Sequence, residues 1–191
     1  NLGLNATPET PTDGFSTAEK LVGLDKLASD PRYSNLTGAG YTVAIIDTGI
    51  DLSNSFFGPD ANHDGIADRI VYQYDFGSGD ASAQDLTGHG TNITSIIGSS
   101  DSTYRGMATG VNFVVFKIFD DGGNAIFGQA EKALQWIENN AALYNILAVN
   151  MSFGDGRNWD WPASTDCGCG NTVKRETYGL GDELATLRSM N

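Results

Sequence analysis

Residues 41–51 read Tyr41-Thr-Val-Ala-Ile-Ile-Asp47-Thr-Gly-Ile-Asp51, and this stretch decides the fold that we expect for the chain. Its apolar run stops abruptly at an acidic residue, which is typical of a parallel strand buried on both faces. Open α/β sheets place their chemistry at the carboxyl ends of such strands. We therefore expect Asp47 to stand at a functional edge of a parallel sheet.

The rest of the chain alternates between strand patterns and helical patterns. This alternation predicts an α/β fold, in which a parallel sheet is flanked by helices. A short amphipathic helix is expected from Ser16, and residues 1–13, which contain two prolines, are expected to form an extended N-terminal arm. The expected strands lie near 41–47, 70–76, 113–119 and 146–152, and the further helices near 88–98, 127–140 and 179–190.

Gly88-His-Gly-Thr91 is the second stretch with chemical content. The glycines let backbone approach the imidazole closely, and isoleucines follow at helical spacing, so His89 is expected at the start of a helix. It is the natural partner for Asp47. The other histidine, His63, lies in a polar loop without such a context, so we assign the catalytic role to His89.

Three motifs together resemble the subtilisin-like serine peptidases, the subtilases. They are Asp47-Thr-Gly-Ile-Asp51, Gly88-His-Gly-Thr91 and Val149-Asn-Met-Ser-Phe-Gly154, and they stand in the order of that family. The likeness runs from about Gly23 to the C-terminus. It implies that residues 14–191 are the N-terminal portion of a subtilase catalytic domain, with a subtilisin-like three-layer fold that is incomplete at the C-terminus.

The resemblance also implies roles for the two motif side chains. Asp47 would orient and stabilise the imidazole of His89, which would take a proton from a serine. The family's Gly-Thr-Ser nucleophile block and the earlier oxyanion-hole Asn occur nowhere in the chain, and Asn92 replaces the family's usual second histidine. We therefore expect the complete protein to be a serine endopeptidase acting on extended polypeptides, and this chain alone to be inactive.

Ser152 is a possible nucleophile that the sequence argues against. Asn150 takes the first position of a Gly-x-Ser-x-Gly pattern, and no strand-to-helix elbow is expected after it. By the resemblance, Ser152, Phe153 and Gly154 instead line the substrate cleft, where backbone groups pair with an extended peptide as an added strand.

The segment Asp60-Ala-Asn-His-Asp-Gly-Ile-Ala-Asp68 predicts a calcium site. Asp60, Asn62, Asp64 and Asp68 occupy relative positions 1, 3, 5 and 9 of an EF-hand-type loop, with Gly at position 6 and the carbonyl of Ile66 at position 7. Position 12 is Val71 rather than Glu, so a whole EF-hand is excluded and another carboxylate or water must complete the coordination. The alternative is an Asx-rich turn that binds no ion.

Charge and composition limit the classes of partner. The 191 residues are 40% hydrophobic without a run long enough to span a membrane, and the formal net charge of -13 argues against nucleic acid and anionic membranes as partners. The expected partners are a peptide or protein substrate and the missing C-terminal portion of the domain. The open sheet edge left by that portion could also form an oligomer.

The two cysteines bear on the compartment in which the protein works. Cys167 and Cys169 favour a small local disulfide in a secreted or extracytoplasmic protein, with free thiols as the alternative.

Two other functions compete with the peptidase. One is a non-catalytic peptide-binding domain that keeps the cleft without a nucleophile. The other, a nucleotide-binding α/β domain, is disfavoured because no Gly-rich phosphate loop follows a strand.

Overall fold

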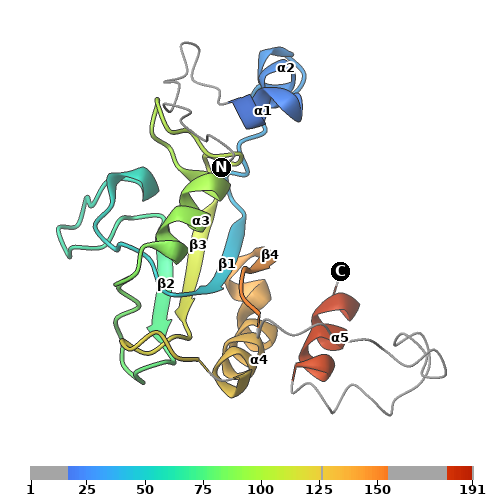
Figure 1. Cartoon of the computed structure of the whole chain (residues 1–191). Coiled ribbons are helices and arrows are strands. Elements are labelled where there is room, and N and C mark those ends of the chain that lie inside the picture. Colours follow the sequence, from blue (N-terminus) through green and yellow to red (C-terminus); the bar gives the residue numbers. More distant parts are fainter. Residues whose placement is uncertain (1–16, 126, 155–179, 191) are drawn as a thin grey trace, which may run out of the picture.

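The computed structural model describes residues 17–125, 127–154 and 180–190, and Figure 1 shows how they are arranged. The expected N-terminal arm and both cysteines lie outside these residues. Within the described ranges, four strands form one parallel sheet in the order β2-β3-β1-β4. All four lie close to their expected bounds, so the predicted parallel sheet is confirmed. The strands are β1 (Thr42–Asp47), β2 (Ile70–Asp75), β3 (Asn112–Lys117) and β4 (Ile146–Met151).

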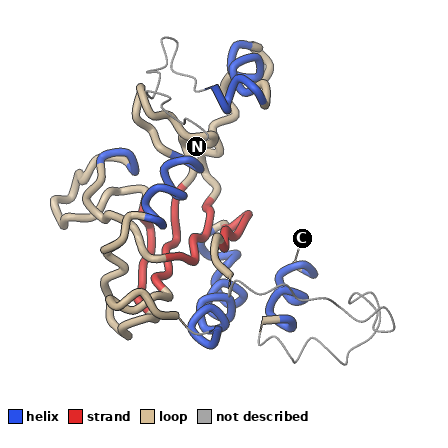
Figure 2. Tube along the Cα trace, viewed as in Figure 1, coloured by secondary structure: helices blue, strands red, loops and turns tan. Residues whose placement is uncertain are grey.

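Helices cover both faces of the sheet, as predicted (Figure 2). One face carries α3 and the short helix η1, and the other carries α4, against which α5 packs. No helix among the described residues is long and apolar enough to cross a membrane. The helices are α1 (Thr17–Leu21), α2 (Leu24–Ser29), η1 (Ser55–Phe57), α3 (His89–Gly98), α4 (Phe127–Tyr144) and α5 (Gly181–Ser189).

The central strand β1 is buried on both faces, which explains its unbroken apolar run. Ile45 packs into a core with Phe57 and Phe113, whereas the next residue, Ile46, packs into a second core with residues of α4. Both isoleucines are fully buried. Because each side chain of this size contributes about 1.5–3 kcal/mol when it is buried, both cores stabilise the position of β1 and therefore of Asp47.

The strand β4 forms one edge of the sheet and is much less buried than β1. Its only strand neighbour in the described chain is β1, and Leu147 keeps 61% of its surface exposed. Apolar residues of α4, β4 and α5 line an adjoining cavity of about 410 Å³. Among the described residues, this edge therefore has no second strand partner, and it carries apolar side chains.

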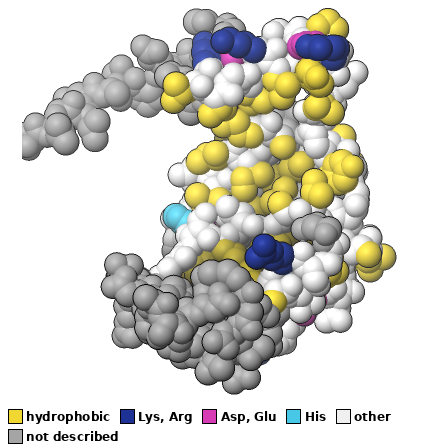
Figure 3. All heavy atoms as spheres, turned by 90° about the vertical axis from the view of Figure 1, so that its right-hand side faces the viewer, with side chains coloured by type: hydrophobic (Ala, Val, Ile, Leu, Met, Phe, Trp, Pro, Cys, Tyr) yellow, Lys and Arg dark blue, Asp and Glu magenta, His cyan; other side chains and the backbone are white. Residues whose placement is uncertain are grey.

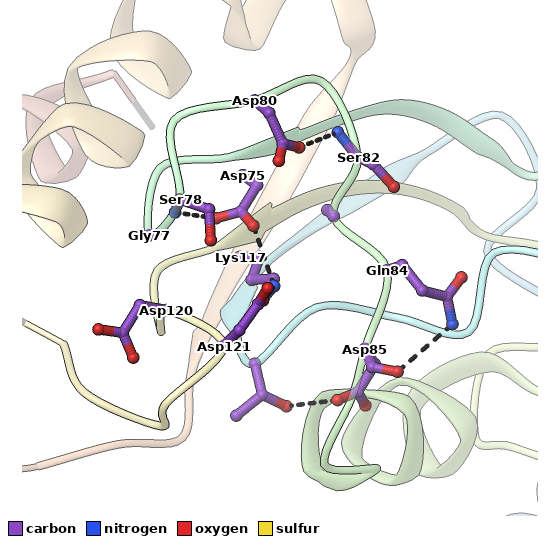
Figure 4. A network of polar contacts seen from close by, with 12 residues as sticks. Asp75, Gly77, Ser78, Asp80, Ser82, Gln84, Asp85, Lys117, Asp120 and Asp121 are labelled. Carbon is purple, nitrogen blue, oxygen red and sulfur yellow. Dashed lines mark hydrogen bonds and ion pairs between the residues drawn. The ribbon is translucent and has the colours of Figure 1, made fainter.

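Three charged side chains form a row at the carboxyl ends of neighbouring strands. Asp75, Lys117 and Asp47 are register partners on β2, β3 and β1, and all three are buried. Lys117 Nζ lies 3.0 Å from Asp75 Oδ2 and 2.6 Å from Asp121 Oδ1 (Figure 4). Burial opposes the charge of the ammonium group, but the hydrogen bonds to Asp121 and Asp75 outweigh it and raise the pKa of Lys117.

Candidate active site

Asp47 and His89 meet at the carboxyl edge of the sheet. His89 Nδ1 lies 2.6 Å from Asp47 Oδ1, which also accepts the backbone N–H of Thr48 at 2.7 Å. The carboxylate side chain is 1% exposed and the imidazole 51% exposed. An imidazole held by a buried carboxylate on one nitrogen, with half of the ring open to solvent, is suited to proton transfer.

Close backbone packing makes this contact possible. Gly90, the residue after His89, lies directly against the loop after β1, and a Cβ added there would collide with the carbonyl oxygen of Gly49. The same Cβ would lie 3.2 Å from the Cβ and from Oδ1 of Asp47. The expected role of the glycine, to allow close approach, is therefore met at Gly90.

Asp85 is a third acidic residue at this edge, and it belongs to none of the predicted catalytic motifs. It lies beside α3 (Figure 4), and its carboxylate accepts the backbone N–H groups of Thr87, Gly88 and Thr91 at 2.9–3.0 Å. Burial alone would raise the pKa of Asp85, but the hydrogen bonds from Thr91, Gly88 and Thr87 outweigh burial and lower the pKa to about 2. The available signal was an acid ahead of a helix start, where free N–H groups need an acceptor.

The model of the Subtilase family matches residues 38–179, which contain Asp47, Asp85 and His89. This chain belongs to the subtilase family. The predicted family is therefore confirmed, and the parallel sheet with helices on both faces is the corresponding three-layer α/β fold.

Two similar proteins are serine proteases by name. The chain is 33% identical to Alkaline serine exoprotease A of Vibrio alginolyticus over 141 residues, which are 71% of this chain and 24% of that protein. It is 34% identical to the Extracellular serine proteinase of Thermus sp. (strain Rt41A) over 140 residues, 70% of this chain and 31% of that protein. The chain thus spans roughly a quarter to a third of the length of these relatives.

Two solved protease structures resemble the fold described above. The crystal structure of a cold adapted subtilisin-like serine proteinase shows a TM-score of 0.59 and 26% identity, covering 87% of this chain and 52% of that one. The CspB protease of Clostridium perfringens has the same TM-score of 0.59 at 24% identity, covering 72% of this chain and 33% of that one.

The other predicted substrate-site residues follow β4. Ser152, Phe153 and Gly154 come directly after the strand, at the edge of the sheet where β1 delivers Asp47. Ser152 Oγ donates to Asn150 Oδ1 at 3.0 Å, and the Phe153 ring meets that of Phe119 edge-on at 6.4 Å. The hydroxyl of Ser152 is thus bonded to a neighbouring amide of its own segment. The helical Asn92, which departs from the family pattern, is exposed.

The loop predicted to bind calcium uses its acidic side chains to hold its own backbone. Asp60 Oδ1 and Asn62 Oδ1 both accept the N–H of Asp64, at 3.0 and 3.2 Å, and Asp64 Oδ1 accepts that of Ile66 at 2.8 Å. Asp68 accepts the N–H of Ala61 at 3.2 Å. Among the residues that the structure describes, no group of three or more His, Cys, Asp or Glu is arranged to hold a metal. Calcium binding therefore stays a prediction.

Proposed function

We propose that this chain supplies the acid and the base of a serine endopeptidase that cleaves extended polypeptides, with the nucleophilic serine in the remainder of the protein. The observation that carries the proposal is the 2.6 Å contact between His89 Nδ1 and Asp47 Oδ1. Membership of the subtilase family supports it, since the relatives named above are serine proteases by name.

The geometry supports a separate role for each of the two side chains. With its Nδ1–H donated to the buried carboxylate, His89 presents Nε2 as the nitrogen that can take the proton of a serine hydroxyl. Asp47 holds the ring in that tautomer and stabilises the imidazolium that forms. His89 would then return the proton to the leaving amine. Each of these steps needs a hydroxyl nucleophile close to the open side of the ring.

We place the substrate along the segment after β4. The segment of Ser152, Phe153 and Gly154 follows an edge strand, so its backbone groups are positioned to pair with an extended peptide. Ser152 is assigned to peptide binding rather than to nucleophilic attack, because its hydroxyl is bonded to Asn150.

The remainder of the domain would dock beside β4. Figure 3 shows this side of the molecule, where hydrophobic side chains are spread over the surface. Leu147 of β4 keeps 61% of its surface exposed and lines the cavity at this edge. A further strand paired with β4 would satisfy the open backbone groups and cover these side chains, whereas a second copy of the chain is the competing occupant.

An assay on an unfolded protein substrate tests the proposal. We expect the 191-residue chain to show no cleavage and the product of the complete gene to cleave. His89→Ala in the complete protein should lower the rate about 10²–10⁴-fold or more, as expected for loss of a general base. The matched variant His63→Ala should leave the rate unchanged, since His63 lies exposed in another loop. His89-dependent cleavage by the 191-residue chain alone would place the nucleophile within this chain, with Ser152 as the first candidate, and would overturn the proposal.

We further propose that the loop from Asp60 to Asp68 binds calcium. Asp60 and Asn62 share a hydrogen-bond donor, and Asn62 Nδ2 contacts Asp64 Oδ2 at 2.9 Å, so three of the four expected side chains already converge. Hard cations favour this density of carboxylate and amide oxygens. The Asp68 carboxylate and the Ile66 carbonyl would add to the ligands, and the ion would link the two ends of the loop.

Thermal unfolding of the chain with calcium and with a chelator tests this site. Binding to the folded state alone raises stability by about 2.7 kcal/mol when free calcium is 100-fold above its dissociation constant. Asp64→Asn should remove the calcium effect, and Asp80→Asn, a matched exposed carboxylate in a different loop, should keep it. Melting curves of the original chain that superimpose in the two buffers would contradict the site.

An extracytoplasmic location is our proposal for the protein. One similar relative is named as an extracellular proteinase, and calcium at the concentrations of extracellular fluids would keep a weak loop site loaded. Fractionation of the source cells, followed by detection of the protein, tests this location directly.

A further inference from the structure

Two threonines, one from each catalytic motif, cross-link the motifs in a reciprocal way. Thr48, which follows Asp47, accepts the backbone N–H of Gly90 on its Oγ1 at 2.9 Å. Thr91, two residues after His89, accepts the backbone N–H of Asp51 on its Oγ1 at 2.9 Å. Each motif therefore holds the backbone of the other through one hydroxyl.

Asp85 is the common acceptor for both hydroxyls. Thr48 Oγ1 donates to Asp85 Oδ1 at 3.0 Å, and Thr91 Oγ1 donates to Asp85 Oδ2 at 2.6 Å. With its hydrogen directed at Asp85, each threonine oxygen keeps its lone pairs for the backbone N–H of the opposite motif. A single carboxylate thus orients both threonine hydroxyls.

The same carboxylate orders the first turn of α3. The N-cap position is Gly88, which has no side chain to accept the free N–H groups of the helix, and Asp85 accepts those of Gly88 and Thr91 in its place. Its own backbone N–H donates to the carbonyl of Ile50 at 2.9 Å. Asp85 therefore contacts the loop after β1 and the turn that carries His89 at once.

We propose that Asp85 is the positioning residue of the Asp47–His89 pair, fixing the orientation of the imidazole by locking the two motifs together through Thr48 and Thr91. The proposal rests on the function proposed above only in giving this pair a catalytic use; the orientation itself is a property of the 191-residue chain. Asp85 does not contact the imidazole in the hydrogen bonds described, so it acts through the backbone of Gly90 and the loop after β1.

The tautomer of His89 distinguishes a positioning role of Asp85 from a purely structural one, because a purely structural role would leave the tautomer unchanged. Nδ1 faces the Asp47 carboxylate, so the neutral ring should carry its proton there, whereas a free imidazole mixes both tautomers. Long-range ¹H–¹⁵N NMR spectra report which ring nitrogen is protonated. The chain has two histidines, and the exposed His63 serves as the internal reference in the same spectrum.

We expect Asp85→Asn to lower the ratio of Nδ1–H to Nε2–H tautomer of His89 several-fold at alkaline pH, without changing His63. The amide would direct a donor at a site that already holds N–H and O–H donors, so the two motifs would separate. Asp101→Asn is the matched control, because Asp101 is also partly buried and accepts two backbone N–H groups, from Thr103 and Tyr104. It should leave His89 unchanged.

A second pair of variants decides the matter if Asp85→Asn does not fold. The double variant Thr48→Val and Thr91→Val keeps the carboxylate and removes both hydroxyls, and it should lower the ratio in the same way. The conservative double variant Thr48→Ser and Thr91→Ser should restore it. A folded protein with an unchanged His89 tautomer in Asp85→Asn, or in the valine variant, would overturn the positioning role.

The complete protein separates this inference from the proposed peptidase activity. If the activity is present, Asp85→Asn should lower kcat several-fold with little change in KM, because Asp85 acts through the orientation of His89 and the peptide is placed along the segment after β4. If the complete protein cleaves no peptide, the function proposed above fails, while the NMR result on the 191-residue chain still confirms or overturns the positioning of His89.

Discussion

Two acidic regions of the molecule use their carboxylates in opposite ways. At the edge of the sheet, Asp47 and Asp85 bond to groups 42 and 37 residues away along the chain, in His89 and Thr48. In the loop from Asp60 to Asp68, the hydrogen bonds of the acidic side chains span at most seven residues. The first region holds distant segments together and is preorganised without a ligand; the second only shapes its own turn.

This difference predicts how much each region contributes to stability. Carboxylates that are buried and join strands should be costly to disturb, whereas exposed carboxylates that bond to adjacent backbone should cost little until an ion is added. Substitutions at Lys117, Gly90, Asp85 and Asp64 test this difference, in decreasing order of the expected change in stability.

Lys117→Met should have the largest effect. It leaves Asp75 buried at the sheet edge without its ion-pair partner, and an uncompensated buried charge costs about 3–5 kcal/mol. Urea unfolding followed by circular dichroism measures the loss. Lys132→Met, which removes the same charge from an exposed position of α4, should stay within about 0.5 kcal/mol. Equal effects for the two lysines would show that the row at the edge is not a stabilising element.

Gly90→Ala should be next, with a loss of about 1–3 kcal/mol, because the added Cβ collides with the loop after β1. Gly128→Ala is the matched control: apart from its own helix, no part of the described chain lies within 4 Å of its added Cβ, and alanine suits a helix better. The two substitutions should therefore change the midpoint of thermal unfolding in opposite directions. A neutral Gly90→Ala would mean that the two motifs are not closely packed.

Acid should weaken the edge through Asp85. Its pKa is lowered to about 2 in the folded protein, so its contribution is present above the ordinary carboxyl pKa of about 3.9 and is lost as the pH falls toward 2. Partial solvent screening reduces this contribution to about 1 kcal/mol. Unfolding free energies measured between these pH values should fall less steeply in Asp85→Asn than in the original chain. Parallel pH profiles would assign the acid sensitivity to other carboxylates.

Asp64→Asn in the presence of a chelator should have the smallest effect, below about 0.5 kcal/mol, since Asp64 is exposed and bonds only within its own loop. Chemical unfolding under calcium-free conditions measures it. A loss as large as that of Lys117→Met would place this loop among the structural elements that hold the sheet, and the contrast between the two regions would disappear.

The elements that the sequence predicted well are those whose signal is local. Apolar runs predicted β1, β3 and β4, an alternating pattern predicted β2, and helical spacing placed His89 at the start of α3, because burial on one or two faces leaves a pattern within a few residues. The pairing of Asp47 with His89 could be anticipated from two motifs and their family. Each of these inferences needed only neighbouring residues or a recognised block.

What the sequence analysis missed depends on contacts between distant residues. Asp85 becomes important only because Thr48 and Thr91 are brought to it from two segments. In the sequence Lys117 is one polar residue within an apolar run, and its partner Asp75 follows only from the pairing of β2 with β3. The strand order leaves no periodic pattern in the sequence. Neither the contacts of Asp85 nor the ion pair of Lys117 with Asp75 could therefore be derived before the topology was known.

The central position of β1 also has a consequence during synthesis of the protein. Both of its strand partners are made later: Thr42 pairs with Asn112 of β3 and with Ile146 of β4. At typical elongation rates the ribosome needs roughly 4–14 s to add the residues that separate Thr42 from Asn112. During that interval this apolar strand, which is buried on both faces in the folded protein, lacks both of its neighbours, and a chaperone that binds extended apolar segments would find a target there.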